Sequence, residues 1–142
     1  HDLDASTTGR VSLRSDGSQI TDLPSWSNSL SEHGRFVVYF ADSDQLLAED
    51  ANGFADIFAL DRATGNLFLL NRSAYGDQAN DWSSSPLVTP DGHYVLFESD
   101  ASNLVDDDTN GAGDVFLCRG PAFVVENGFE SGGTAGWSNT VP

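Results

Sequence analysis

The chain has 142 residues, enough for one compact domain or two small repeated units, and carries 6 Lys+Arg against 22 Asp+Glu, a formal net charge of −16. Such an acidic chain repels nucleic acid and anionic membranes and attracts divalent cations. We therefore expect no nucleic-acid partner. A single cysteine excludes an internal disulfide, and no apolar stretch approaches the ~20 residues of a membrane span, so we expect no membrane insertion. The chain starts at His1 and contains no Met, which we interpret as a processed or excised piece of a longer precursor.

Short β-strands are the elements that the sequence predicts. They share β-branched and aromatic residues bounded by Gly or Asp turns. In chain order the predicted strands cover residues 9–13, 29–31, 35–40, 56–60, 66–70, 87–89, 93–97 and 114–118. No stretch shows the 3.6-residue periodicity of an amphipathic helix, so the sequence predicts an all-β fold.

An internal repeat organises these strands. Residues 34–58 match residues 92–116 at an offset of 58, with nine identical pairs in 25 positions. The pairs are Gly34/Gly92, Val37/Val95, Asp42/Asp100, Leu46/Leu104, Asp50/Asp108, Asn52/Asn110, Gly53/Gly111, Asp56/Asp114 and Phe58/Phe116. Four short antiparallel strands in a repeat of ~40–60 residues is the pattern of a β-propeller blade.

We therefore predict tandem four-stranded antiparallel repeats that resemble propeller blades. Residues 1–62 form the first unit with a strand of a preceding blade, residues 63–120 form the second, and residues 121–142 form a Gly/Ser-rich tail. Two blades cannot close a ring of about four to eight, so the propeller is incomplete within one chain. Its open sheet edges are expected to pair with another copy. The tail is interpreted either as a docking segment or as a disordered end.

The second unit also carries a recognisable motif. Residues 85–97 are SPLVTPDGHYVLF, residues 99–105 are SDASNLV, and DTNG at residues 108–111 is followed by DVF. Over roughly residues 8–120 the two units resemble the TolB-like, PD40-type β-propeller repeat of secreted bacterial proteins. The resemblance implies a propeller-type sheet and a secreted, extracellular or periplasmic, bacterial setting. It implies no catalytic activity, because such repeats mostly serve as scaffolds and binding surfaces.

The loop at residues 106–114 has oxygen-bearing side chains at alternate positions, then a Gly for the bend and a closing Asp. Ca²⁺ takes six to eight hard oxygen ligands, and a loop of this spacing can wrap one ion. Leu117 stands where an EF-hand loop has its bidentate Glu, so we predict a strand–loop–strand site. The predicted Ca²⁺ ligands are the side chains of Asp106, Asp108, Asn110 and Asp114 and the backbone carbonyl of Ala112.

The first unit repeats this spacing at residues 48–56. Its predicted ligands are the side chains of Asp50, Asn52 and Asp56 and the carbonyl of Phe54. Ala48 replaces the first carboxylate, so we expect weaker or water-completed binding, with Glu49 or Asp44 as substitute ligands. For both loops one alternative stays open, in which Asp and Asn only cap turns and the Gly takes a left-handed conformation.

The leading functional hypothesis is a non-enzymatic, secreted, Ca²⁺-binding structural protein whose copies assemble into a ring or an extracellular filament. An alternative is a glycan- or protein-recognition module of a larger propeller that uses Trp26, Tyr75 and Trp82, although these aromatics would fit equally well between blades. A hydrolase is the third hypothesis. It is the weakest, because the three His residues are dispersed and no Gly-x-Ser-x-Gly nucleophile motif occurs.

Overall fold

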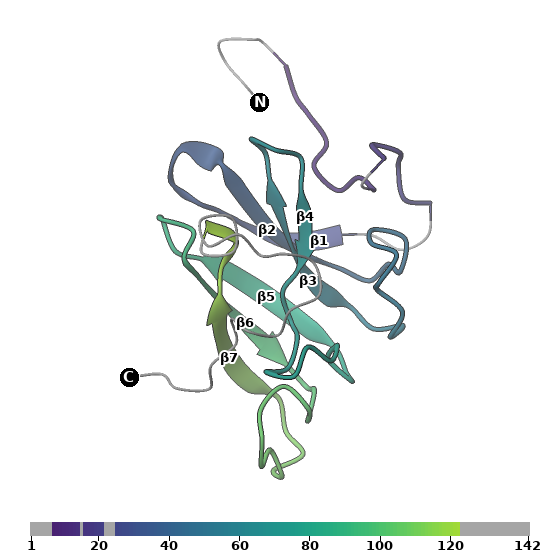
Figure 1. Ribbon diagram of the computed structural model, residues 1–142, viewed down its shortest axis with the longest axis vertical. Coiled ribbons are helices and arrows are strands. Elements are labelled where there is room, and N and C mark those ends of the chain that lie inside the picture. Colours follow the sequence, from purple (N-terminus) through teal and green to yellow (C-terminus); the bar gives the residue numbers. More distant parts are fainter. Residues whose placement is uncertain (1–6, 15, 22–24, 123–142) are drawn as a thin grey trace.

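The computed structural model describes residues 7–14, 16–21 and 25–122, which form two antiparallel β-sheets with almost no helix (Figure 1). The elements are β1 (Ser25–Leu30), a 3-10 turn η1 (Glu32–Gly34), β2 (Phe36–Ala41), β3 (Asp56–Asp61), β4 (Leu67–Leu69), β5 (Ser83–Val88), β6 (Tyr94–Ser99) and β7 (Asp114–Arg119). The predicted all-β, antiparallel character is confirmed. Among the described residues, no helix is long and apolar enough to cross a membrane.

The first sheet is a meander of four strands in the order β1-β2-β3-β4. β2 has the sequence FVVYFA, and its β-branched and aromatic side chains suit the pleated surface of a buried strand. It pairs with β3 along its whole length, from Phe36 opposite Asp61 to Ala41 opposite Asp56. Most side chains of β2 and β3 are buried, so this sheet is covered on both faces.

The second sheet contains three strands in the order β5-β6-β7. Burial alternates strictly along β6, where Val95 and Phe97 are buried while Tyr94 and Leu96 are exposed. Because successive side chains of a strand point to opposite faces, one face of this sheet is packed and the other lies open. The packed face meets the first sheet.

The second sheet reproduces details of the first at an offset of 58 residues. A β-bulge interrupts the first strand of each sheet, where Ser27 and Ser85 have φ angles of +43° and +55°. Gly34 and Gly92 occupy the same turn before the second strand, with φ angles of +68° and +78°. Such positive φ angles suit Gly, which explains why the sequence keeps it in both copies.

The main core lies between the two sheets. Val38, Ile57 and Ala59 from the first sheet pack with Val95 and Phe97 from the second. A smaller core covers the opposite face of the first sheet, where the buried residues include Val37, Tyr39, Phe58 and Leu69, and Val11 and Ile20 pack against them. The segment before β1 therefore covers the first sheet, while nothing among the described residues covers the open face of the second.

Two features differ from the sequence-based expectation. The described residues form sheets of four and three strands, where two four-stranded units were expected. They close neither a barrel nor a propeller, so the propeller-like arrangement stays a prediction. Residues 9–13 form no extended strand, since only Leu13 pairs, with Gln19, in an isolated bridge. Arg10 and Ser12 alternate with Val11 and Leu13 in this run, which lies over the first sheet as a cover, and no strand of the described residues lies beside it to extend its pairing. The expected tail from residue 123 onward lies outside the described residues.

Candidate metal-binding loops

The two predicted calcium loops occupy the same place in the two sheets. Residues 42–55 connect β2 to β3, and residues 100–113 connect β6 to β7. Gly53 and Gly111 have φ angles of +74° and +63°, so both loops bend through a left-handed residue at the predicted position.

The Asn before this Gly organises each loop. The side-chain amide of Asn52 donates to Asp56 at 3.0 Å, and that of Asn110 donates to Asp114 at 2.9 Å. In each loop the backbone amide two residues beyond the Asn donates to its Oδ1, at 3.0 and 2.8 Å. The shared Asn, Gly and Asp therefore produce one common turn, which also agrees with the turn-capping interpretation.

The first loop brings two predicted ligands together inside the protein. Asp50 is 3 % exposed and Asp56 is 0 % exposed, and their carboxyl groups lie within hydrogen-bonding reach of each other. The Oδ2 atom of each carboxyl group is buried and receives no hydrogen bond within the described part of the chain. Two acceptors without donors are costly in a dry interior, so this arrangement calls for a proton or a cation between them.

The other oxygens of this carboxylate pair are bound by amides. Asp50 Oδ1 accepts a hydrogen bond from the Gln78 side chain at 3.2 Å, and Asp56 Oδ1 accepts from Asn52 and from Asn71. Side-chain amides therefore donate to one oxygen of each carboxyl group, and the other oxygen of each receives none of these hydrogen bonds.

Asn71 is fully buried and joins several elements. Its Oδ1 accepts the backbone amide of Ile57 in β3 at 3.0 Å, and its Nδ2 donates to Ser83 Oγ in β5 at 3.0 Å as well as to Asp56. The side chain therefore links the end of the first loop to both sheets.

The surroundings perturb both acids in the same direction. Burial, the charge of Asp56 and the charge of Asp44 raise the pKa of Asp50 to about 8, although the bond from Gln78 opposes the shift. Burial also raises the pKa of Asp56, against the bonds from Asn71 and Asn52. Two ionised carboxylates at this position repel each other, and a bound cation would remove that repulsion.

The second loop is open to solvent. Asp106 and Asn110 are exposed and Asp108 and Asp114 are half-buried. Asp106 accepts a hydrogen bond from the Tyr75 hydroxyl at 3.0 Å, and this bond raises the pKa of Tyr75. Asn110 and Asp114 share a hydrogen bond. Within the described part of the chain, Asp106 forms no hydrogen bond with either of them.

The difference between the loops arises from the segment after each sheet. Residues 71–83, between β4 and the start of β5, supply the amides and the hydroxyl that enclose the first loop. At the offset of 58, the matching segment for the second loop is residues 129–141, which lie outside the described residues. Among the described residues, the second loop therefore has the same turn without a counterpart of the segment that encloses the first loop.

The first loop suits a hard divalent cation. Its two carboxylate oxygens without a donor supply the negative charge that such a cation needs. The amides of Asn52, Asn71 and Gln78 direct N–H groups at the pair, and their oxygens accept backbone amides. Across the described residues, no three His, Cys, Asp or Glu side chains gather as a metal-binding group, so any site here must be completed by neutral oxygens and water.

Asn71 and Gln78 are the residues of this site that sequence reasoning missed. They lie 15 and 22 residues beyond Asp56 and outside the loop motif. One signal was present in the sequence: Gly17 and Gln19 match Gly76 and Gln78 at an offset of 59. The structure pairs Gln78 with Arg72 in a small hairpin, and Gln19 with Leu13 in the same way. A gapped comparison of the repeats would have included this hairpin in the repeated unit.

The remaining candidates offer no second site. Trp26, Tyr75 and Trp82 are exposed, and the Trp26 ring contacts Phe40 with centroids 5.6 Å apart. Cys118 lies on the packed face of the second sheet, where burial raises the pKa of its thiol to about 12. A thiol so difficult to ionise is a poor nucleophile.

Comparisons with known proteins leave the chain without an assigned family. No family model, no curated protein and no solved structure matches it.

Proposed function

We propose that this protein is a non-enzymatic, secreted, Ca²⁺-binding β-repeat protein that acts as a structural, self-assembling module. The proposal combines the duplicated strand–loop–strand unit, the acidic surface and the resemblance to TolB-like, PD40-type repeats. A secreted bacterial setting agrees with a loop site of low charge, because Ca²⁺ sites of extracellular modules work at ~10⁻⁴–10⁻³ M.

One observation carries the metal assignment. The Oδ2 atoms of Asp50 and Asp56 are buried and have no hydrogen-bond donor among the described residues, and the two carboxyl groups lie within hydrogen-bonding reach of each other. A turn-capping role requires only the oxygens that already accept amide hydrogen bonds. The second oxygen of each carboxyl group has no role in the turn, and a cation would satisfy both oxygens while the two carboxyl groups are ionised.

The position of this pair assigns the ion an architectural role. Asp50 and Asp56 belong to the loop between β2 and β3, while Gln78 and Asn71 follow β4 and lead into β5. An ion at the pair would fasten the end of the first sheet to the segment that begins the second. Since only the folded chain assembles these ligands, Ca²⁺ would stabilise the folded state by mass action.

Calorimetric titration with Ca²⁺ tests the proposal. We expect the wild-type protein to bind Ca²⁺ and Asp50→Asn to lose the site at the first loop. Asp107→Asn is the matched control, because it makes the same charge change at an exposed residue of the second loop whose φ of +63° suits Asn. Loss of binding in Asp107→Asn but not in Asp50→Asn would contradict the assignment to the first loop.

A recognition module is the second candidate function. The observation in its favour is that three large aromatic side chains, Trp26, Tyr75 and Trp82, are exposed. Exposed aromatic rings stack on sugars and on protein partners. Saturable binding on a glycan array that is lost in both Trp26→Ala and Trp82→Ala would favour this function over a purely structural one.

A further inference from the structure

The open face of the second sheet is apolar although it lies in solvent. Leu87, Leu96 and Leu117 stand opposite one another on β5, β6 and β7, and Val115 extends the row. We call these four residues the outer face. All four are at least 40 % exposed. An exposed apolar row of this kind marks an interaction surface.

The repeat identifies what covers such a face. At the offset of 58, Leu96, Val115 and Leu117 correspond to Val38, Ile57 and Ala59 of the first sheet. Those three residues are fully buried, because the second sheet packs on them.

The same comparison of the two sheets identifies the surface that would pack on the outer face. In the internal interface the second sheet contributes Val88, Val95 and Cys118 to the core. Their counterparts in the first sheet are Leu30, Val37 and Leu60, which line an open cleft.

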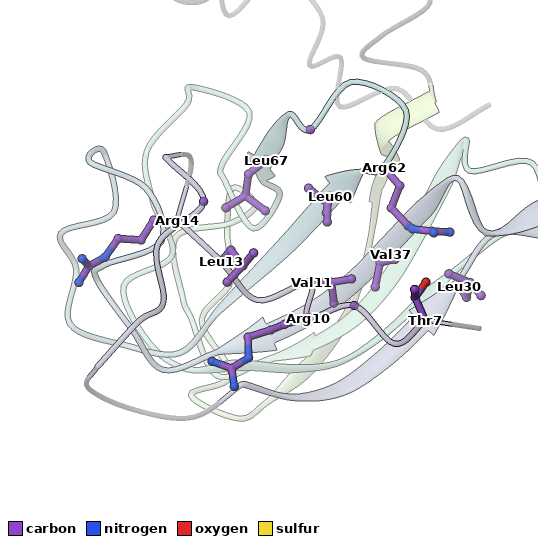
Figure 2. A pocket seen from close by; sticks show the side chains of 13 residues that line it. Thr7, Arg10, Val11, Leu13, Arg14, Leu30, Val37, Leu60, Arg62 and Leu67 are labelled. Atoms are coloured by element: carbon purple, nitrogen blue, oxygen red, sulfur yellow. The ribbon is translucent and has the colours of Figure 1, made fainter. Parts of the chain in front are cut away.

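This cleft has a volume of about 790 Å³ and lies on the far side of the first sheet (Figure 2). Figure 2 shows Val11, Leu13, Val37, Leu60 and Leu67 around it. We call Leu30, Val37, Leu60 and Leu67 the cleft face. Leu30 is exposed, Leu60 and Leu67 are half-buried, and Val37 is buried beneath the cleft. Each end of the two-sheet stack therefore carries one half of the kind of interface that joins the two sheets.

Charge also favours contact between the two ends. Arg10, Arg14 and Arg62 stand at the margin of the cleft, and they are three of the six cationic residues of the chain (Figure 2). Glu98 lies beside the outer face, opposite Val115, and the acidic second loop leads into β7, whereas Arg119 lies on the same face at the far end of β7. Contact between the loop end of the outer face and the basic margin of the cleft would steer two copies into one orientation.

The segment before β1 completes the correspondence. Leu70 and Ala79 pack into the interface between the two sheets. Val11 and Ile20 correspond to them at an offset of 59 and pack on the cleft side of the first sheet. The hairpin that carries Gln78 near Asp50 therefore has a structural copy that carries Gln19 beside the cleft.

We infer that a second copy of this chain docks head to tail, with the outer face of one copy in the cleft face of the next. The inference rests on the assembly role proposed above and names its surfaces. Docking would place Gln19 of the incoming copy near Asp108, as Gln78 is placed near Asp50, and so enclose the second loop. Because the two faces differ, the contact is heterologous and repeats into a ring or a filament.

Sedimentation of paired variants tests this inference. Leu117→Glu alters the outer face and Leu30→Glu alters the cleft face, at residues that are 55 % and 59 % exposed, so both variants should fold. Ala63→Glu, at an exposed residue of the β3–β4 turn, is the control for added charge. We expect the wild-type chain and Ala63→Glu to associate with rising concentration in Ca²⁺. Each face variant should associate at least about tenfold more weakly.

A mixture of the two face variants gives the decisive result. Each variant keeps one intact face, so equal amounts should form a 1:1 dimer that grows no further. If Leu117→Glu associates like the wild type, the named faces are wrong although the assembly proposal stands. If only Leu117→Glu is impaired, the contact is symmetric and the head-to-tail inference is wrong. A wild-type chain that stays monomeric at several hundred micromolar, with and without Ca²⁺, contradicts both.

Discussion

The carboxyl groups of Asp50 and Asp56 meet inside the protein, and each keeps one buried oxygen that no donor of the described residues satisfies. The two acids lie at opposite ends of the loop turn that the sequence repeat predicts, and amides from the following segment surround them. An isolated arrangement of this kind destabilises a folded chain, whereas the same arrangement around Ca²⁺ stabilises it.

The first prediction concerns pH in the presence of a chelator. The pKa of Asp50 is about 8 in the folded protein and about 4 in an unfolded chain, so the folded state holds its proton more tightly. This contribution to stability is complete below about pH 4 and disappears as the pH rises through 8. We expect the free energy of unfolding to fall by roughly 1–3 kcal/mol over this range, with a flatter profile in Asp50→Asn. Parallel wild-type and variant profiles from urea denaturation would contradict the raised pKa.

The second prediction concerns Asn71. Replacing it by Ala removes the acceptor for the Ile57 amide and a donor to Asp56, both of which are buried. We expect a loss of about 2–4 kcal/mol in the free energy of unfolding, because buried groups are left without partners. Asn110→Ala is the control, since Asn110 also donates to an Asp but is exposed, and should change stability by about 0.5 kcal/mol or less. Equal effects of the two substitutions would show that Asn71 does not link the sheets.

The third prediction compares two glycines with similar φ angles. A Cβ on Gly92 would lie 2.6 Å from Cδ2 of Phe36 and 3.1 Å from Cβ of Ala122, whereas a Cβ on Gly111 would meet nothing within 4 Å. Gly111→Ala should cost about 1–2 kcal/mol through its left-handed backbone alone. Gly92→Ala should cost about 1–3 kcal/mol more, because it also overpacks the contact with Phe36. Thermal unfolding measures the stability of both variants. If Gly111→Ala is as unstable as Gly92→Ala, the contact with Phe36 does not contribute to the cost of the Gly92 substitution.

The strands were predictable where local and tertiary preferences agree. β2, β3, β6 and β7 contain β-branched and aromatic runs that open after Gly or Asp, and the structure has strands at these places. β5 was predicted too short. Its first residues are three serines with weak β propensity. Ser83 and Ser84 are held in the strand by pairing with Ser99 and Glu98 of β6, and Ser85 lies in the bulge that follows.

The candidate site was predictable only within the loops. The spacing of Asn52, Gly53 and Asp56 specifies a local turn, and the turn forms in both units. Burial of Asp50 depends on Gln78 and on the packing of the second unit, which lie beyond any loop motif. The sequence therefore predicts the second loop, with its additional acid Asp106, as the stronger site, while the unsatisfied buried oxygens lie in the first.

The most direct test of the calcium assignment is the effect of Asp50→Asn on the free energy of unfolding, measured in a chelator and in saturating Ca²⁺. At pH 9, above the pKa of about 8 of Asp50, both carboxyl groups are ionised, so without Ca²⁺ the substitution removes a buried repulsion and should stabilise the protein by about 1–3 kcal/mol. With Ca²⁺ at ~100 times its dissociation constant, the wild type gains about 2.7 kcal/mol and the variant loses this gain, so the difference should shift by about 2.7 kcal/mol in favour of the wild type. The same difference in both conditions, or a wild-type stability that does not respond to Ca²⁺, would contradict a calcium ion at Asp50 and Asp56.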